Sequence, residues 1–222
     1  MDLTNKEKII EILFNNKAHF GHKKNRVHPK AKKYIYTFQN NNSIIDLEKT
    51  YNQILLVKNE IKNIKKNNQK LIFVGTKSLL AETIKKYATE NNFPYLIAKW
   101  PTGFFTNFES ISKNIKKLNE MIKEEEGENW NKFPKHEQLR LKRELNKLKR
   151  TYEGVINLSK LPEAVFIVDF KREINTFKEA NKMKIKTFGI CDTNFNPDLI
   201  DFPIVANDDL LNSVETVLKL IF

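Results

Sequence analysis

The chain has 222 residues, of which 40% are apolar, and this length favours one substantial core with an appendage over two full domains. Its net charge of +12 and pI near 9.5 favour RNA, DNA or another acidic partner and predict salt-sensitive binding. Cys191 is the only cysteine, which excludes an intramolecular disulfide and a multi-cysteine zinc site. No run of 18 apolar residues occurs, so we expect no membrane span, and the polar N-terminus resembles no signal or transit peptide.

A short amphipathic helix is predicted first, with apolar residues at helical spacing between Ile9 and Phe14. Thr4 and Glu7 have the spacing of a capping box, in which each side chain accepts a hydrogen bond from the other residue's backbone N–H. We therefore expect the helix to begin close to Thr4.

Residues 17–33, called the basic segment below, hold seven Lys or Arg and three His but no Asp or Glu. Unpaired ammonium groups are too costly to bury, so these side chains face water or an anion. A merely solvated charged face is the usual explanation of such a run. Gly21 and Pro29 instead predict a structured loop, and with aromatic residues nearby we expect a polyphosphate backbone as the partner.

Two strands, at residues 34–38 and 43–46, are predicted around an asparagine-rich turn. A helix of about 20 residues is predicted after Asp46, and its apolar stripe comprises Ile54, Val57, Ile61 and Ile64. Beyond it, short apolar runs alternate with helices. The predicted strands are 71–75, 95–98, 164–169 and 186–191, and the predicted helices are 78–91, 172–183 and one from residue 208. This alternation is typical of an α/β fold, so we predict a Rossmann-like parallel sheet with flanking helices.

One block, residues 108–152, interrupts the alternation. Two helical stretches, 109–126 and 135–152, flank a turn marked by Gly127 and Pro134. Narrow apolar stripes predict an antiparallel helical hairpin, or coiled coil, with Leu139, Leu141, Leu145 and Leu148 on its second arm. The sheet domain would then comprise residues 1–107 and 153–222. The second arm is rich in Lys and Arg, which suits either an RNA or protein contact or an exposed solvated arm.

Catalytic chemistry has little support. Gly75-Thr76-Lys77-Ser78 follows a strand and could cradle a phosphate, but both glycine-rich nucleotide-binding patterns are absent. Asp46, Asp169 and Asp192 each end a strand, so a Mg²⁺-dependent phosphoryl-transfer or receiver-type domain is the enzymatic alternative. Helix capping and Asx turns explain these aspartates equally well.

The three histidines of the basic segment lack a further ligand at a metal-site spacing. Imidazoles that touch phosphates or stack on bases suit this setting better. No motif places a base beside Cys191, so we expect that residue to be a small buried apolar side chain rather than a nucleophile.

Seven ordered blocks carry a resemblance to a known family: AHFGHKKNRVHPKAKKYIYTF, SIIDLEKT, LIFVGTK, KWPTGFFTNF, LPEAVFIVD, EANKMKIKTFGICDTNFNPDLIDFPI and ANDD. Together they resemble the S-two family of small-subunit ribosomal proteins, of bacterial and organellar type, over residues 13–221. The resemblance implies a Rossmann-like domain with a helical hairpin, no catalytic activity, no cofactor and no bound metal. It also implies contacts with small-subunit rRNA and neighbouring small-subunit ribosomal proteins, without a homo-oligomer.

Candidate RNA-binding residues follow from this resemblance and from the charge pattern. In the basic segment they are Lys17, His19, His22, Lys23, Lys24, Arg26, His28, Lys30, Lys32 and Lys33, and the block around Trp100 adds Lys99, Trp100, Thr106 and Asn107. We expect phosphate contacts and shape recognition to dominate over base reading.

The chain departs from the family pattern at two glycine positions. Pro101-Thr102-Gly103 stands where the family has Leu-Gly-Gly, and Ser159-Lys160 stands where it has a glycine pair. Lys outnumbers Arg 34 to 5, although Arg grips phosphate better. This bias indicates an AT-rich genome, such as that of an organelle, plastid-type or mitochondrial, or of a low-GC bacterium.

Overall fold

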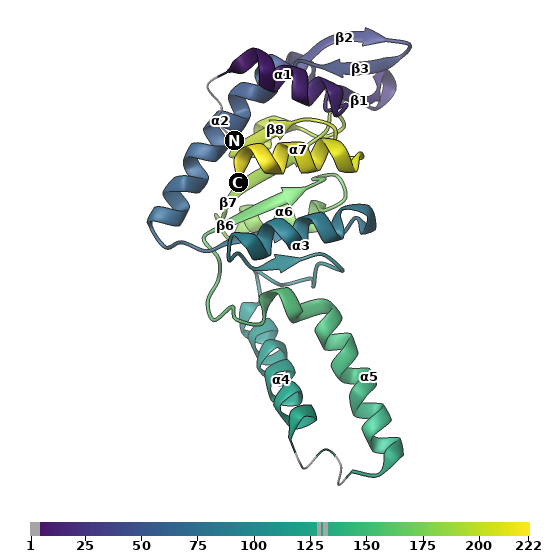
Figure 1. Ribbon diagram of the computed structural model, residues 1–222, viewed down its shortest axis with the longest axis vertical. Helices are drawn as coiled ribbons and strands as arrows, with labels where there is room; N and C mark the ends of the chain where they lie inside the picture. Colours follow the sequence, from purple (N-terminus) through teal and green to yellow (C-terminus); the bar gives the residue numbers. More distant parts are fainter. Residues whose placement is uncertain (1–4, 128–129, 131–132) are drawn as a thin grey trace.

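Five parallel strands form the central sheet, in the order β5-β4-β6-β7-β8 (Figure 1). They are β4 (Leu71–Val74), β5 (Tyr95–Leu96), β6 (Ala164–Val168), β7 (Lys186–Cys191) and β8 (Phe202–Val205). The computed structural model describes residues 5–127, 130 and 133–222. The predicted α/β fold with a parallel sheet and flanking helices is confirmed.

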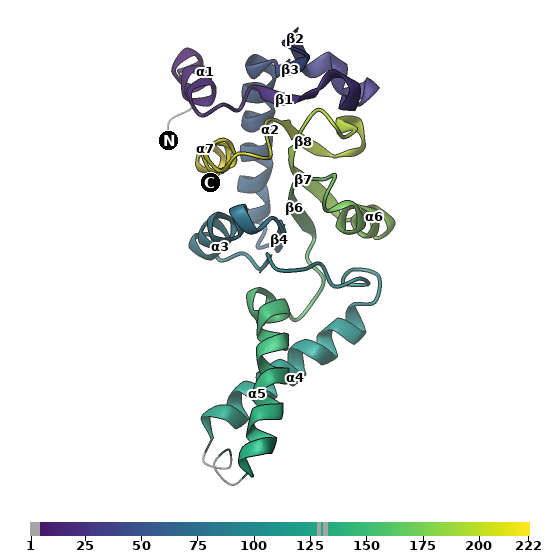
Figure 2. The ribbon, with the colours of Figure 1, turned by 90° about the vertical axis from the view of Figure 1, so that its right-hand side faces the viewer.

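Helices cover both faces of this sheet. Successive side chains along each strand point to opposite faces, so the apolar strands present apolar side chains on both faces, and the helices bury them. Leu71 and Phe73 of β4 pack with one set of helices: α1 (Lys6–Asn15), α2 (Leu47–Lys66), α3 (Ala81–Glu90) and α7 (Leu211–Ile221). Ile72 and Val74 point to the other face, where α6 (Ile174–Lys182) and the base of the hairpin pack. Figure 2 shows the sheet edge-on between α3 and α7 on one side and α6 on the other.

A second, antiparallel sheet of three strands lies beside α1 and contains much of the N-terminal region. Its order is β1-β3-β2, with β1 (Phe20–Lys23), β2 (Ile35–Gln39) and β3 (Asn42–Ile45). Asn40 and Asn41 join β2 to β3 with φ values of 47° and 66°. Two successive positive φ values are typical of the tight hairpin turn that asparagine favours, which confirms the predicted turn.

Side chains cap the first two helices. Asp46 precedes α2 and accepts hydrogen bonds from the backbone N–H groups of Glu48 and Lys49. These donors of the first turn would otherwise lack an acceptor within the helix. Asn5 caps α1 by accepting from the N–H of Lys8. The predicted capping box involves Thr4, which lies outside the described residues.

The hairpin consists of α4 (Phe108–Glu126) and α5 (Lys135–Tyr152), which extend together from the sheet domain (Figure 1). Its seam contains Leu118 and Leu145, both fully buried, and ion pairs join Lys117 to Glu144 and Lys149 to Glu125. The predicted stripe on α5 is wrong in one member: Leu139 is 58% exposed. Part of the predicted turn, at 128–129 and 131–132, lies outside the described residues.

Two strands were missing from the prediction. β1 lies within the basic segment and is only four residues long, and its side chains do not alternate between buried and exposed. β8 contains Pro203, which is tolerated because β8 is an edge strand and needs no proline N–H on its outer side. Two helices also begin later than predicted: α6 begins at Ile174 rather than at residue 172, and α7 begins at Leu211 rather than at residue 208. Within the described ranges, no helix is long and apolar enough to cross a membrane.

Candidate nucleic-acid interface

The basic segment is folded and hydrogen-bonded to the central sheet. It forms β1 and two 3-10 turns, Lys24–Arg26 and Pro29–Tyr34. Thr193, directly after β7, holds it at two points: the His22 N–H donates to Thr193 Oγ1 at 3.0 Å, and the His28 N–H donates to the Thr193 carbonyl at 2.8 Å. These bonds fix the backbone from which the basic side chains extend. Less conformational freedom is then lost when those side chains bind a partner.

Ser43 and Gly21 complete this junction. Ser43 Oγ donates to the His22 carbonyl at 2.8 Å and lies 3.1 Å from Thr193 Oγ1. A Cβ atom at Gly21 would lie 2.5 Å from Ser43 Oγ and 2.9 Å from the Thr193 side chain. Only glycine therefore lets β1 approach Thr193 this closely.

His22 is tied to the same loop through its ring. Its Nδ1 lies 2.8 Å from Asp192 Oδ2, and its Nε2 lies 3.0 Å from Asn194 Nδ2. The hydrogen bond to Asp192 raises the pKa of His22, although partial burial acts against it. The Asp192-Thr193-Asn194 turn thus supports the basic segment, a role that the sequence alone did not reveal.

Most cations of the basic segment remain exposed and free. Six exposed side chains make no ion pair with any residue that the structure describes: Lys17, Lys23, Lys24, Arg26, Lys30 and Lys32. Lys33 is engaged, because its Nζ pairs with Asp198. Lys24 Nζ lies 5.7 Å from the centre of the Phe38 ring, and β2 exposes that ring to 40% and Tyr36 to 78%. Free charge on the basic segment therefore lies next to exposed aromatic rings on β2, a combination that single-stranded RNA sites use.

Two candidate residues lie inside the protein instead. His19 is 8% exposed; its ring stacks on Phe14 at a centroid distance of 4.4 Å and packs against the tilted ring of Phe20 at 4.2 Å. Burial lowers its pKa, which favours the neutral ring. Trp100 is 7% exposed and packs against Phe104 and Phe105. Both rings support the fold from these positions.

The block around Trp100 wraps a carboxylate of α6. Glu179 accepts from Trp100 Nε1 at 3.1 Å and from the N–H groups of Gly103 and Phe105 at 2.8 and 3.0 Å. Gly103 has a φ of 87°, so the loop keeps a glycine where one is required. The exposed candidates here are Lys99, Thr106 and Asn107. Glu179 escaped the sequence analysis because it is more than 70 residues away along the chain.

Charged side chains of the protein itself pair with one another at the carboxyl end of the central sheet. Lys77 Nζ lies 3.3 Å from Asp169 Oδ2 and 2.5 Å from Asp209 Oδ1. Burial opposes its charge, but the hydrogen bond to Asp209 and the nearby carboxylates raise the pKa of Lys77. Burial also raises the pKa of Asp208 well above its usual value, helped by the charges of Asp169 and Asp192.

The weak candidate for a phosphate cradle, residues 75–78, is occupied as well. The Thr76 N–H and hydroxyl both donate to Glu173, whose carboxylate takes the place that a phosphate would need. Within the described ranges, two groups bring potential cation ligands within 4.8 Å: His22, Asp192 and Asp209; and Asp169, Asp208 and Asp209. Asp46 belongs to neither, since it caps α2. The pocket predicted from Asp46, Asp169 and Asp192 is therefore not assembled.

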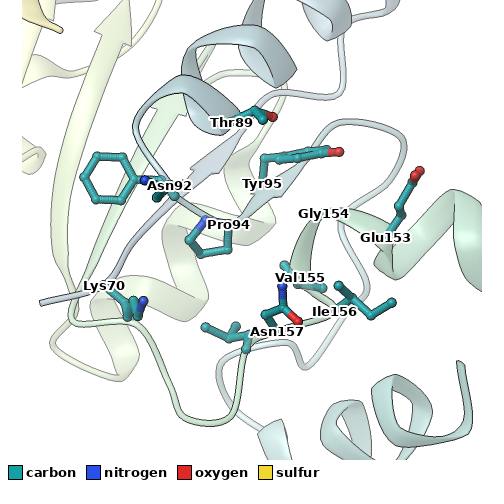
Figure 3. Close-up of a pocket in the computed structure, with 12 residues that line it drawn as sticks. Lys70, Thr89, Asn92, Pro94, Tyr95, Glu153, Gly154, Val155, Ile156 and Asn157 are labelled. Atoms are coloured by element: carbon teal, nitrogen blue, oxygen red, sulfur yellow. The ribbon is translucent and has the colours of Figure 1, made fainter. Parts of the chain in front are cut away.

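A cavity of about 410 Å³ lies elsewhere, between β5 and the base of the hairpin (Figure 3). Its lining includes Tyr95, Glu153 and Asn157. A Cβ atom at Gly154 would lie 2.3 Å from the Tyr95 carbonyl, so this glycine lets the hairpin base meet β5. The cavity lies apart from the basic segment and holds no cluster of catalytic groups among the described residues.

Comparison with known proteins decides the family. The model of the family described as Ribosomal protein S2 matches residues 13–222. The chain belongs to the ribosomal protein S2 family. It is 38% identical over 208 residues to a protein of Coprothermobacter proteolyticus named "Small ribosomal subunit protein uS2", covering 94% of this chain and 78% of that relative. The ribosomal protein S2 family is structural and not enzymatic, so the expectation that this chain is no enzyme is confirmed and the Mg²⁺-dependent alternative has no support.

Proposed function

We propose that this protein is a structural constituent of the small ribosomal subunit, and that its basic segment binds small-subunit rRNA. The observation that carries the proposal is the set of six exposed cations without an ion pair among the described residues, on a segment that Thr193 holds in place. The name of the bacterial relative supports the ribosomal setting. Lys and Arg side chains there would neutralise backbone phosphates, and each neutralised phosphate releases counterions.

Exposed aromatic rings would extend this contact. Phe38 lies on β2 beside Lys24, and Tyr36 lies two residues earlier on the same strand. Unpaired bases can stack on these exposed rings. Lys99, Thr106 and Asn107 form a separate exposed group before α4 that would contact rRNA independently. His19 and Trp100 would contribute indirectly, by shaping the surfaces on which these groups lie.

The other partners would be neighbouring small-subunit ribosomal proteins. Residues 191–222 hold six acidic groups against Lys219 alone. Asp208 is buried, and Asp198 and Asp209 pair with lysines, so a protein contact here is supported by the shortage of cations rather than by free negative charge. We expect a single copy in the subunit rather than a homo-oligomer. The lysine-rich composition suits an AT-rich genome, of an organelle such as a plastid or of a low-GC bacterium, and the base composition of the coding sequence tests this.

A charge-matched pair of variants tests the RNA contact. Lys23→Ala with Arg26→Ala should weaken binding to protein-free small-subunit rRNA and reduce the salt slope by roughly 1.4–1.8, from about 0.7–0.9 per phosphate contact. The control, Lys62→Ala with Lys66→Ala, removes two exposed charges from the far end of α2. Equal slopes for the two variants would show that the basic segment does not touch phosphate.

A further inference from the structure

One carboxylate joins the two ends of the loop at residues 97–107, which connects β5 to α4. Trp100 Nε1 donates to Oε1 of Glu179 at 3.1 Å, and the Phe105 N–H donates to its Oε2 at 3.0 Å. Between them along the chain, the Gly103 N–H donates to Oε1 at 2.8 Å. Figure 2 shows the loop, in teal, passing below α6 before α4 begins. We call Glu179 and these three donors the carboxylate clamp.

The loop has few other means of holding its shape. It contains no regular helix or strand, and its internal backbone bonds run from the Phe104 N–H to the Pro101 carbonyl and from the Asn107 N–H to the Gly103 carbonyl. A buried backbone N–H without an acceptor is costly. Hydrogen bonds to a charged acceptor are also stronger than those between neutral groups. The fold of the loop therefore depends on the clamp.

Glu179 serves the loop and no cation. Lys178 and Lys182 lie on the same helix within one turn, yet Glu179 forms no ion pair with any residue that the structure describes. Glu and Lys three residues apart on a helix commonly pair. Here both carboxylate oxygens instead accept from the loop, and the half-buried position strengthens these bonds relative to bonds in open water.

The clamp fixes where the exposed polar side chains of the loop lie. Lys99 directly precedes Trp100 at one end. Thr106 and Asn107 directly follow Phe105 at the other end. These three side chains are exposed, whereas their clamped neighbours Trp100 and Phe105 are 7% and 1% exposed. The carboxylate thus sets the distance between a cation at one end and two hydrogen-bonding side chains at the other, so less freedom is lost when a partner contacts both ends.

We infer that Glu179 is a positioning residue for rRNA: it holds the exposed group before α4 in its binding arrangement without touching RNA itself. That group is Lys99, Thr106 and Asn107. The inference rests on the proposed function, in which this group contacts rRNA, but it uses no residue of α4, α5 or the basic segment. A purely electrostatic role predicts the opposite sign, because a carboxylate repels phosphate and its removal would then tighten RNA binding.

The test compares two charge-matched variants of the full-length protein. Glu179→Gln removes the charge and replaces one acceptor oxygen by an NH₂ group, which cannot accept from the loop. Glu173→Gln is the control, because Glu173 lies directly before α6 and accepts from the Thr76 N–H and hydroxyl rather than from the loop. Binding to protein-free small-subunit rRNA is measured across a salt series, with backbone footprinting. A third variant, Lys99→Ala with Asn107→Ala, is called the exposed-group variant and identifies the nucleotides that this group protects.

The indole N–H of Trp100 reports on the clamp in the absence of RNA. Its NMR resonance, identified by its loss in Trp100→Phe, should move in Glu179→Gln and stay in place in Glu173→Gln. An unmoved resonance in Glu179→Gln would contradict the clamp. Thermal unfolding checks that each variant is folded at the temperature of the RNA measurements. If Glu179→Gln is not, Glu179→Asp takes its place, since it keeps both oxygens on a shorter side chain and should show the same losses in smaller measure.

Glu179→Gln should lose the nucleotides that the exposed-group variant loses, and its salt slope should fall by about 0.7–0.9, the value for one phosphate contact. It should keep the nucleotides lost by Lys23→Ala with Arg26→Ala. Glu173→Gln should keep all of them. Adding Glu179→Gln to the exposed-group variant should lower rRNA affinity no further, because its effect passes through that group.

The inference is wrong if Glu179→Gln binds rRNA more tightly than the original protein, or if it weakens binding equally with and without the exposed group. The proposed contact of the exposed group fails if the exposed-group variant keeps its full footprint, and the inference then falls with it. The inference alone fails if that variant loses nucleotides that Glu179→Gln keeps.

Discussion

Replacing Thr193 by valine tests how the basic segment is held without removing any charge. The Thr193 hydroxyl accepts from the His22 N–H at 3.0 Å, lies 3.1 Å from Ser43 Oγ and donates to Asp192 Oδ1 at 2.9 Å. Valine has nearly the same shape but no hydroxyl. The His22 N–H then loses its partner, and an unsatisfied buried donor costs about 1–3 kcal/mol.

We therefore expect the free energy of unfolding to fall by about 1–3 kcal/mol, which for a chain of this size lowers Tm by roughly 2–12 °C. Urea unfolding and calorimetry measure this loss. Because β1 is then held less firmly, rRNA affinity should also fall although every cation remains. Thr193→Ser keeps the hydroxyl and should behave like the original protein. A Thr193→Val protein with unchanged stability and unchanged RNA affinity would refute the role given to this junction.

Three further predictions follow from other residues. Gly189→Ala should lower the free energy of unfolding in urea by at least about 3 kcal/mol. Gly189 has a φ of 150°, and a Cβ atom there would lie 1.8 Å from the Ile167 carbonyl oxygen. A loss of free energy below about 1 kcal/mol would contradict this close approach of β7 to β6. His22 has a raised pKa, so its stabilising effect should be full below the unfolded pKa near 6.5 and vanish as the pH rises through the folded value. The free energy of unfolding of the original protein should exceed that of His22→Gln by less and less between pH 5.5 and 9. A difference that grows with pH would contradict the raised pKa of His22. Tyr36→Ala removes a ring that is 78% exposed and should weaken binding of unpaired rRNA by about 1–3 kcal/mol without lowering Tm; equal affinity would mean that no base stacks there.

The alternation of short apolar runs with helices was sufficient to predict the central sheet from sequence. β4 and β6 are buried on both faces and read as continuous apolar runs. β8 was missed because Pro203 argues against a strand unless the strand lies at an edge, and edge position is a property of the topology. Asp46 was identified as a potential helix cap, and the structure confirms this role.

The candidate site was only partly predictable, because burial and long-range partners decide it. The charges of the basic segment were visible in the sequence, but their support by Thr193 crosses more than 160 residues of chain. His19 and Trp100 were chosen by residue type, and the structure places both in the interior. The division into a sheet domain and a hairpin of residues 108–152 stays a prediction. Limited proteolysis at the hairpin base tests it.

The most direct test of the central claim is co-sedimentation with ribosomal subunits. The tagged full-length protein is mixed with bacterial small subunits depleted of their own S2 protein and run through a sucrose gradient at low and at raised salt. We expect the protein to migrate with the small subunit at low salt and to dissociate in part as salt screens the phosphate contacts. A protein that stays at the top of the gradient at both salt concentrations would contradict its assignment to the small subunit.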